Sequence, residues 1–406
     1  MKSRVLFVDD EVNILKGLQR MLWKMRDEWT MAFADSGAKA LDLLDKAPAD
    51  VVVTDMRMPG MDGAQLLYEV RKRHPSAVRI ILSGYANEEA VLRTTGPAHQ
   101  YLAKPCDSEV LTKTVKSALE LRGLLGSENL RKLVSGLETL PTPPDIFSDL
   151  QTEMSSPNAS AARVAKIISR DVAMTAQILK LTNSAFFSLP NKISTPQQAV
   201  QLLGFETVRA LVVMSSFFSS FEGDAKTSSL LQDLSQGSLV IGAAAKAIAE
   251  AEKFDGTTAD QACCAGTLSH VGTLLLVANW PKKFKNTLSM AENTDVDIVE
   301  AERKVFGACH AELGAYLLGL WGFTDPIVEA VAYHHEPSRC SYRRVNILTA
   351  LHVAQSLVQS EDNEDAHKEM SGAPLDEQYL SEAGVRDRLP LWQEACEGII
   401  HRDAET

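Results

Sequence analysis

The chain has 406 residues, which is long enough for two or three domains. Apolar residues make up 45% and charged residues 23%, the composition of a soluble globular protein with a buried core in each domain. The net charge of −12 argues against a nucleic-acid-binding surface, which needs a basic face. DNA is therefore not an expected partner.

The start of the chain predicts neither export nor membrane insertion. Only four apolar residues separate Arg4 from the acidic run that begins at Asp9, too few for a signal peptide. No apolar run approaches the roughly 18 residues that cross a bilayer. The six cysteines contain no CxxC pair, so we expect free thiols rather than disulfides. These features predict a cytoplasmic protein that does not enter the membrane.

The first ~120 residues alternate between strand and helix patterns. Apolar and β-branched runs predict strands, and helical spacing of apolar residues predicts helices between them. The strands are expected at 4–8, 30–34, 51–53, 78–82 and 100–103. The helices are expected at 12–26, 37–46, 66–74, after Asn87, and at 108–125. Five such units predict a doubly wound parallel sheet of five strands.

After Gly126 the pattern changes to helices throughout. Thr195-Pro196 places a cap before proline at the first helical position, and Asp325-Pro326 opens another helix. The stretch 239–249 is rich in alanine and predicts a buried helix, whereas 361–374 is polar and predicts a loop. The fold class is therefore multi-domain: an α/β domain followed by a domain that is nearly all helix.

Polar side chains follow four of the predicted strands. Asp9 and Asp10 follow the first strand, Asp55 the third, Ser83 the fourth and Lys104 the fifth. The carboxyl ends of parallel strands meet at one edge of a sheet, where ligands bind. Carboxylates crowded there repel one another by about 4 kcal/mol per pair at 4 Å and an effective dielectric near 20. A divalent cation removes that repulsion, and hard oxygen ligands favour Mg²⁺.

This set of residues predicts a phosphorylation site. Asp55 is the nucleophile toward a phosphoryl donor, while Mg²⁺ and Lys104 neutralise the phosphoryl oxygens. The hydroxyl of Ser83 can donate a hydrogen bond to the attached group. A cis peptide bond between Lys104 and Pro105 is expected to turn the lysine inward.

At these residues the chain resembles the receiver domains of two-component response regulators. The resemblance covers about residues 1–122 and rests on VDDE, DMRMPGMDG, SG and KP in that order. It implies phosphorylation of Asp55 by a sensor histidine kinase and a role for Tyr101 as an aromatic switch. It further implies a magnesium site built from Asp10, Asp55 and the backbone carbonyl of Arg57, with Asp9 acting partly through water.

The later part of the chain resembles the HDOD family, helical relatives of the HD metal phosphohydrolases. The resemblance rests on LPTPP at 140–144, DVAMTAQILKLTNSAFF at 171–187, STPQQAVQLLGFETVRALV after it, HAELGAYLLGLWGF at 310–323 and IVEAVAYHHEP. We therefore expect a receiver domain at 1–122, a helical linker at 123–139, an HDOD domain at 140–340 and a helical extension at 341–406.

The resemblance also implies that the helical domain is not an enzyme and has no catalytic residues. An active HD site takes a His, a His-Asp pair and a late Asp as metal ligands. By register these positions hold Gly237, the pair Ser269-His270, and Gln355, and no GYP sequence follows Glu336. Glycine and serine are poor ligands for such metals.

Four histidines remain as a candidate vestigial site in the helical domain: His270, His310, His334 and His335. Imidazole suits Zn or Fe, so a metal is one interpretation. Histidines left in the core of a decayed pocket are the interpretation we favour, and we assign this domain no cofactor.

The sequence therefore predicts a phosphorelay response regulator. Phosphorylation in the receiver domain would control a non-catalytic HDOD domain that binds a downstream signalling protein, such as a cyclic-di-GMP enzyme, or a nucleotide. Homodimerisation is left open. The alternative is a phosphorylation-gated cyclic-di-GMP or nucleotide phosphodiesterase with an atypical histidine-rich metal site. A DNA-binding regulator is a third hypothesis, which the acidic balance opposes.

Overall fold

The computed structural model describes residues 2–83, 98–122, 125–136, 140–142, 144–156, 159–183, 192–203, 219–220, 225–293, 296–341, 343–361 and 374–400. The chain divides into two compact units, one made mainly of residues 1–138 and the other mainly of residues 139–406.

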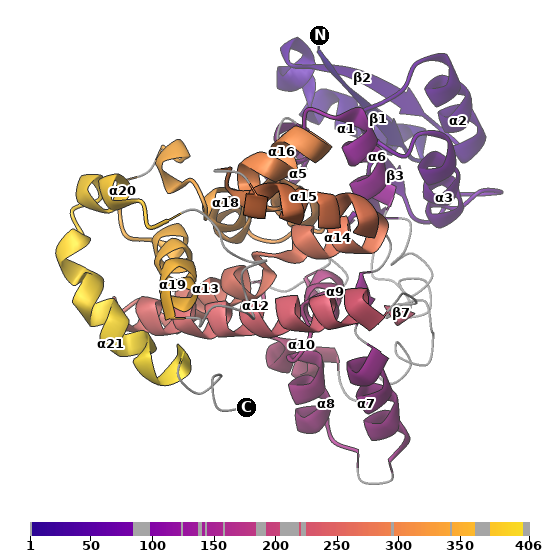
Figure 1. The fold of residues 1–406 in the computed structure, drawn as a ribbon. Helices are drawn as coiled ribbons and strands as arrows, with labels where there is room; N and C mark the ends of the chain where they lie inside the picture. The colour runs from indigo at the N-terminus through magenta and orange to yellow at the C-terminus, as the bar shows by residue number, and fades with distance from the viewer. Residues whose placement is uncertain are drawn as a thin grey trace. The chain divides into compact units, whose positions relative to one another are not determined.

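The first unit is built on a parallel sheet of five strands, as predicted (Figure 1). The strand order is β2-β1-β3-β4-β5. The strands are β1 (Ser3–Val8), β2 (Trp29–Ala34), β3 (Val51–Asp55), β4 (Val78–Ser83) and β5 (Gln100–Ala103). The helices described around it are α1 (Val12–Met21), α2 (Gly37–Lys46), α3 (Gly63–Arg73) and α5 (Ser108–Leu121). The strand β3 is buried along its whole length, which explains its β-branched run.

Three helices differ from their predicted bounds, and one of them, expected at 108–125, ends at Leu121. The helix expected at 12–26 ends at Met21, and a 3₁₀ helix follows it at Trp23–Asp27. The side chain of Met25 stays buried in that tighter turn, so apolar spacing alone could not reveal the change. The helix expected at 66–74 starts earlier because Asp62 caps it, with the Asp62 side chain and Gln65 forming a capping box. The helix expected after Asn87 lies outside the described residues.

A buried polar network joins the sheet to the segment that follows it. Arg79 of β4 is fully buried, and its guanidinium donates to the backbone carbonyls of Ala77 and Ser135. The ring of His99 lies 2.8 Å from the Arg79 guanidinium and 2.8 Å from the Ser135 carbonyl. Ser135 belongs to α6 (Glu128–Gly136), within the predicted linker. A buried guanidinium is stable only where its donors are paired, so this network fixes α6 against the sheet.

The second unit is helical, as predicted, apart from a short parallel pair of strands that the sequence did not indicate. That pair is β6 (Pro141–Thr142) and β7 (Ser219–Ser220). The first helices are α7 (Pro144–Ser155), α8 (Ala161–Ile168), α9 (Val172–Thr182), α10 (Pro196–Leu203), α12 (Ala225–Ala251), α13 (Gly256–Leu268) and α14 (Val271–Asn279). The remainder are α15 (Pro281–Asn293), α16 (Ile298–Phe306), α17 (His310–Leu320), α18 (Asp325–Tyr333), α19 (Ile347–Glu361), α20 (Glu377–Glu382) and α21 (Leu389–Ile400).

Several local expectations for this unit are confirmed. The helix α10 begins at Pro196, as Thr195-Pro196 predicted, and α18 begins at Asp325, as Asp325-Pro326 predicted, with Thr324 in the cap position. The 3₁₀ helices Pro337–Arg339 and Arg386–Arg388 join the later helices. The helical extension expected after residue 340 contains α19, α20 and α21. Most of the predicted loop at 361–374 lies outside the described residues.

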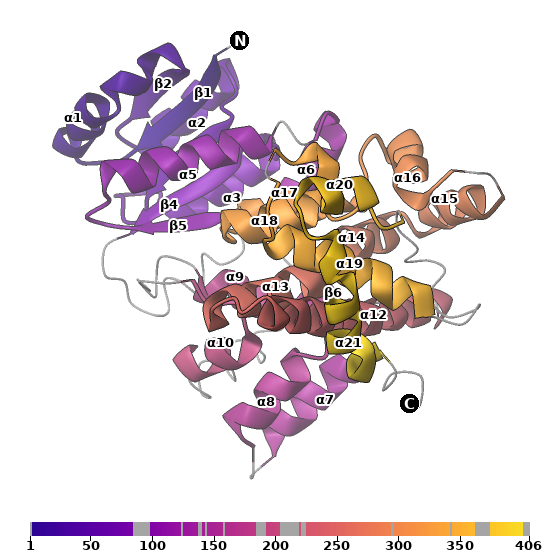
Figure 2. The same cartoon turned by 90° about the vertical axis from the view of Figure 1, so that its left-hand side faces the viewer.

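The long helix α12 forms the centre of the helical unit, packed against α13, α19 and α21 (Figure 2). It contains the predicted buried helix, and Ile241, Ala244 and Ile248 are fully buried. Its contact with α13 depends on a pair of glycines. A Cβ atom on Gly266 would lie 2.6 Å from the Cα of Gly242, closer than real Cβ atoms approach. The two helix backbones therefore pack at a distance that no larger residue permits.

One stretch among the described residues is long and apolar enough to cross a membrane, contrary to the sequence expectation. It is Gly256–Asn279, which spans α13 and α14. Of its most apolar 18-residue window, 83% is buried inside the protein. Burial of this kind is typical of the core helices of a globular domain.

Replacing Gly266 by alanine is expected to destabilise the helical unit. The added methyl group would force α12 and α13 apart, and such overpacking costs about 1–3 kcal/mol of unfolding free energy. The matched control is Gly256→Ala at the start of α13, where an added Cβ meets nothing within 4 Å. Differential scanning calorimetry of the full chain should show a lowered transition for Gly266→Ala alone. Equal transitions for both variants would contradict the packing described.

Candidate functional site

The predicted phosphorylation site lies at the carboxyl edge of the parallel sheet. Asp9 follows β1 and is buried, while Asp55 is the last residue of β3. Lys104 follows β5, and its ammonium group lies 2.7 Å from Asp9 Oδ2 and pairs with Asp55 Oδ1. The structure thus brings together three of the predicted residues from three different strands.

The lysine is held in its charged form by these two carboxylates. Burial favours the neutral amine, but hydrogen bonds to Asp55 and Asp9 outweigh it and raise the pKa of Lys104 above its ordinary value. The peptide bond between Lys104 and Pro105 is cis, as expected. A charged lysine beside the Asp55 carboxylate can neutralise an incoming phosphoryl group.

The other side of Asp55 is closed by the backbone that follows it. Asp55 Oδ2 accepts a hydrogen bond of 2.8 Å from the backbone N–H of Arg57. A Cβ atom on Gly63 would lie 2.2 Å from the Asp55 carbonyl oxygen, so only glycine allows α3 to begin this close to the site. The carboxylate of Asp55 is therefore oriented by both its lysine and its backbone partner.

The remaining predicted residues of this site are placed as follows. Asp10 adjoins Asp9 and is partly buried. Ser83 ends β4 in register with Ala103, and its side chain lies outside the described residues. Tyr101 lies on β5, 9% exposed, in the same apolar cluster as Ile81. The ligand role of the Arg57 carbonyl remains a prediction.

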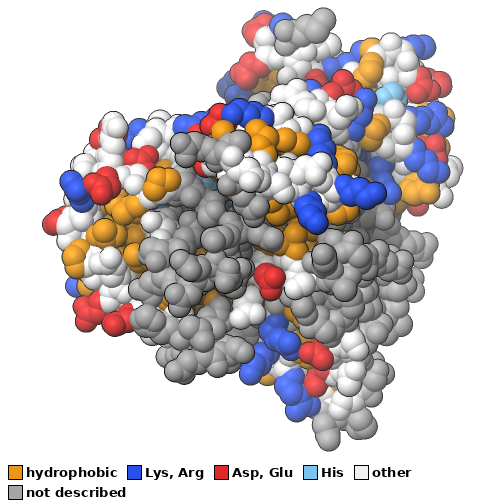
Figure 3. Space-filling view, viewed as in Figure 1, with side chains coloured by type: hydrophobic (Ala, Val, Ile, Leu, Met, Phe, Trp, Pro, Cys, Tyr) orange, Lys and Arg blue, Asp and Glu red, His pale blue; other side chains and the backbone are white. Residues whose placement is uncertain are grey.

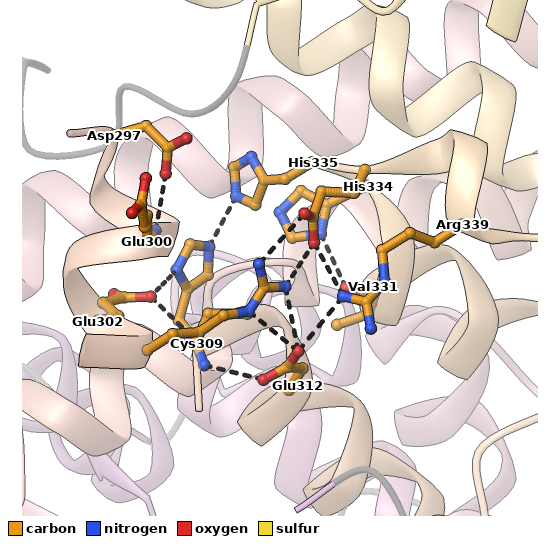
Figure 4. A network of polar contacts seen from close by, with 12 residues as sticks. Asp297, Glu300, Glu302, Cys309, Glu312, Val331, His334, His335 and Arg339 are labelled. Atoms are coloured by element: carbon orange, nitrogen blue, oxygen red, sulfur yellow. Dashed lines mark hydrogen bonds and ion pairs between the residues drawn. The ribbon is translucent and has the colours of Figure 1, made fainter. Parts of the chain in front are cut away.

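The four histidines of the helical unit meet in one buried cluster. One ring nitrogen from each of His270, His310, His334 and His335 lies within 4.8 Å of the other three. The Nε2 atoms of His310 and His335 lie 2.8 Å apart. Figure 4 shows the rings of His334 and His335 next to each other, with Glu302 and Glu312 on the segments beside them.

The outer nitrogens of three of these rings are held by protein groups. His310 Nδ1 lies 2.7 Å from the buried carboxylate of Glu302, and His334 Nδ1 lies 2.8 Å from the Val331 carbonyl. His270 Nδ1 lies 2.9 Å from Ser269 Oγ, which itself donates to the Gly266 carbonyl. Oxygens that accept at Nδ1 place the ring proton there, so Nε2 of each ring keeps its lone pair.

The interior of the cluster strongly disfavours charged imidazole. Burial, reinforced by neighbouring histidines, lowers the pKa of His270 and His335 well below the ordinary value. Burial followed by the proximity of His310 lowers the pKa of His334 to about 3. Among the described residues, His334 Nε2 is one of the buried polar atoms without a hydrogen-bond partner. Leaving such an atom unpaired costs about 1–3 kcal/mol.

An ion-pair network holds the segments that carry the cluster. Arg303 of α16 binds Glu312 of α17 at 3.1 Å and also pairs with Glu336, which follows the two adjacent histidines. Arg339 lies 2.9 Å from the same Glu336 carboxylate (Figure 4). The bond with Arg303 is the main cause that lowers the pKa of Glu336. The start of α17 and the end of α18 are thereby fixed to α16.

Two of the positions expected to lack hydrolase ligands contact this cluster. Ser269 adjoins His270, and the side-chain amide of Gln355 lies 3.3 Å from His270 Nε2. Gly237 is buried in α12. None of these three offers the imidazole or carboxylate expected of an active HD site.

Sequence reasoning missed Glu302, Glu312 and Arg303. A signal for Glu302 was present, because it falls on the apolar face of α16, with Ile298, Val299 and Phe306 buried beside it. An acid at a buried position of an amphipathic helix needs a partner, and here the partner is His310.

Comparison with known families matches both units. A response regulator receiver domain matches residues 5–116, and an HDOD domain matches residues 140–337. The chain therefore belongs to the response regulators and carries a receiver domain followed by an HDOD domain.

Individual relatives resemble mainly the receiver part. The hydrogenase transcriptional regulatory protein HoxA of Cupriavidus necator is 38% identical over 31% of this chain and 26% of its own length. The receiver domain of an HD domain-containing protein from Pseudomonas fluorescens is 31% identical, covering 30% of this chain and 98% of that one, with a TM-score of 0.29. The MmoQ response regulator of Methylococcus capsulatus is 21% identical over 64% of this chain and 98% of its own, with a TM-score of 0.47. The matched part of this chain spans 26% of the length of HoxA and 30% of the length of the transcriptional regulatory protein GlrR of Escherichia coli.

Proposed function

We propose that this response regulator accepts a phosphoryl group on Asp55 from a sensor histidine kinase and that its HDOD domain then acts by binding. The observation that carries the first part is the convergence of Asp9, Asp55 and Lys104 at the carboxyl edge of the sheet. We place it in the cytoplasm, with domain limits of 1–122, 123–139, 140–340 and 341–406.

The donor set fits a magnesium ion. The carboxylates of Asp9, Asp10 and Asp55 are hard oxygen ligands of the kind Mg²⁺ prefers, and the Arg57 carbonyl would complete the protein ligands. When bound, the ion would neutralise the negative charge of the phosphoryl oxygens. Lys104 is already charged and paired with two of the carboxylates, so it can turn from them to the phosphoryl group.

The reaction itself needs little else from the protein. A carboxylate oxygen of Asp55 attacks the phosphorus, the bond from phosphorus to the donor nitrogen breaks, and the donor leaves with that electron pair. The Arg57 N–H fixes the orientation of the carboxylate during attack. The Ser83 hydroxyl, one strand away, would donate to the transferred group.

We propose that the signal leaves the receiver through β4 and β5. Movement of Ser83 toward the phosphoryl group opens space beside β4, which Tyr101 of β5 can occupy. Arg79 on β4 and His99 just before β5 bind the Ser135 carbonyl of α6, so a shift of these strands reaches the linker directly. A self-association surface beside Tyr101 could also carry the signal out of the receiver, and its use would produce a homodimer.

We propose that the HDOD domain is not catalytic. Gly237, Ser269 and Gln355 occupy positions where an active HD site holds ligands, so binding a protein partner is the function that remains. A downstream signalling protein, such as a cyclic-di-GMP enzyme, is the partner we propose. The face in Figure 3 carries acidic and basic side chains side by side in the receiver unit, and the net charge is −12, so DNA is not proposed.

Phosphorylation should depend on Asp55 and on Mg²⁺. We expect Asp55→Asn to reduce incorporation of labelled phosphate from acetyl phosphate to background, because the nucleophile is lost. The control is Asp50→Asn at the opposite end of β3, where Asp50 binds the Arg4 backbone and Arg122. That variant should label like wild type. Equal labelling of Asp55→Asn and wild type would show that another residue accepts the phosphoryl group.

Purified full-length protein should not hydrolyse cyclic di-GMP in the presence of Mg²⁺, Mn²⁺ or Fe²⁺. Without a metal-activated water the reaction loses several kcal/mol of transition-state stabilisation. Product formation, measured by chromatography beside an active metal-dependent phosphodiesterase, should equal that of the enzyme-free reaction. Turnover that disappears in the double variant His310→Ala and His334→Ala would instead support the phosphodiesterase alternative.

A further inference from the structure

We infer that the four clustered histidines form a closed site for one divalent transition metal ion of the Zn²⁺ type, which joins three segments of the helical unit. His270 lies between α13 and α14, His310 begins α17, and His334 and His335 follow α18. This inference does not depend on phosphorylation of the receiver or on the partner of the HDOD domain.

The directions of the ring nitrogens support a metal more strongly than the mere number of histidines. At His270, His310 and His334, the outer Nδ1 atom is occupied by Ser269, Glu302 and the Val331 carbonyl, respectively. Metal-binding histidines characteristically use such second partners to fix the ring and its tautomer. The lone pair that each of these three rings keeps lies on Nε2, and at His270 a bound ion would take the place of the Gln355 amide nitrogen, which lies 3.3 Å from that atom.

The separations between the rings are compatible with a single ion. Two nitrogens bound to zinc at about 2.0–2.1 Å in tetrahedral geometry are about 3.3 Å apart. The Nε2 atoms of His310 and His335 are 2.8 Å apart, and the whole set lies within 4.8 Å. Small rotations of the rings would therefore close the set around an ion. His334 Nε2, which is buried and has no hydrogen-bond partner among the described residues, would become a ligand.

The charges and chemistry of the surroundings select the class of metal. All four rings are buried, and neutral imidazole is the form that binds metals. Imidazole suits Zn²⁺, Fe²⁺, Ni²⁺ and Cu²⁺, whereas Mg²⁺ prefers oxygen. The carboxylate of Glu302 is fully buried, and its Oε1 atom has no hydrogen-bond partner among the described residues. It would offset part of the charge of the ion through His310.

The close approach of two helices also positions the site. A Cβ atom on Gly272 would lie 2.0 Å from the His310 carbonyl oxygen, so α14 packs directly on the start of α17. His270 and His310 consequently stack with ring centroids 5.2 Å apart. Four protein ligands leave no open position for a substrate water, so the geometry indicates a structural ion rather than a catalytic one.

The test uses the untagged full-length chain after chelator treatment and dialysis. Competition against a chromophoric chelator should show one Zn²⁺ bound per chain, and Co²⁺ should give the visible absorption of a tetrahedral nitrogen site. His334→Gln and His335→Gln should each weaken Zn²⁺ binding at least tenfold. Glu302→Gln, which removes the partner of His310, should weaken it by about 10–100-fold. The control His74→Gln, in the receiver domain, should bind like wild type.

Two results would overturn the inference. One is Zn²⁺ affinity that stays the same in the double variant His334→Gln and His335→Gln, which would place the ion at a surface site. The other is wild-type protein that binds no Co²⁺ or gives only an octahedral spectrum. The second measurement needs no variant, so it decides the question even if the substituted proteins fail to fold.

Discussion

The pairing of Lys104 with Asp9 and Asp55 is the interaction around which the receiver site is arranged. Two carboxylates at the ends of neighbouring strands repel each other, and a charged lysine from a third strand offsets that repulsion. The parallel sheet makes this possible because its carboxyl ends meet at one edge. A phosphoryl group at Asp55 would compete with the two carboxylates for Lys104, so it would change the ion pairs that tie the end of β5 to the ends of β1 and β3.

The contacts of Arg79 and His99 with Ser135 connect such a change in the sheet to α6. The buried Arg79 cannot move independently of its partners, because each lost hydrogen bond would leave a charged group unpaired in the core. It shares the Ser135 carbonyl with His99, whose pKa is held far below the ordinary value by burial and by Arg79 itself. The neutral ring and the guanidinium together bind the linker helix α6 to β4 and to the start of β5. A receiver that reorganises these strands must therefore move or release α6.

The sequence predicted the strands well because each is a buried run between turn residues, and parallel pairing then placed Asp9, Asp55 and Lys104 together. It did not predict that α1 ends at Met21 and that a 3₁₀ helix follows. Met25 is buried in the 3₁₀ helix, as it would be in a continued α-helix, so the apolar spacing does not distinguish the two. The four histidines were recognised individually, but their meeting depends on packing that periodicity does not encode. The Gly272 contact with His310 is one such feature. Glu302 was overlooked for the same reason, because its partner lies on another helix.

We propose that phosphorylation in the receiver alters the helical domain through α6. Amide hydrogen exchange of the full chain, with and without beryllofluoride as an acyl-phosphate mimic, measures this directly. We predict altered exchange in β4, β5 and α6 and also in helices of the second unit, with no change in Asp55→Asn. Exchange differences confined to residues 1–122 would contradict the account, because the receiver would then switch without reaching its output domain.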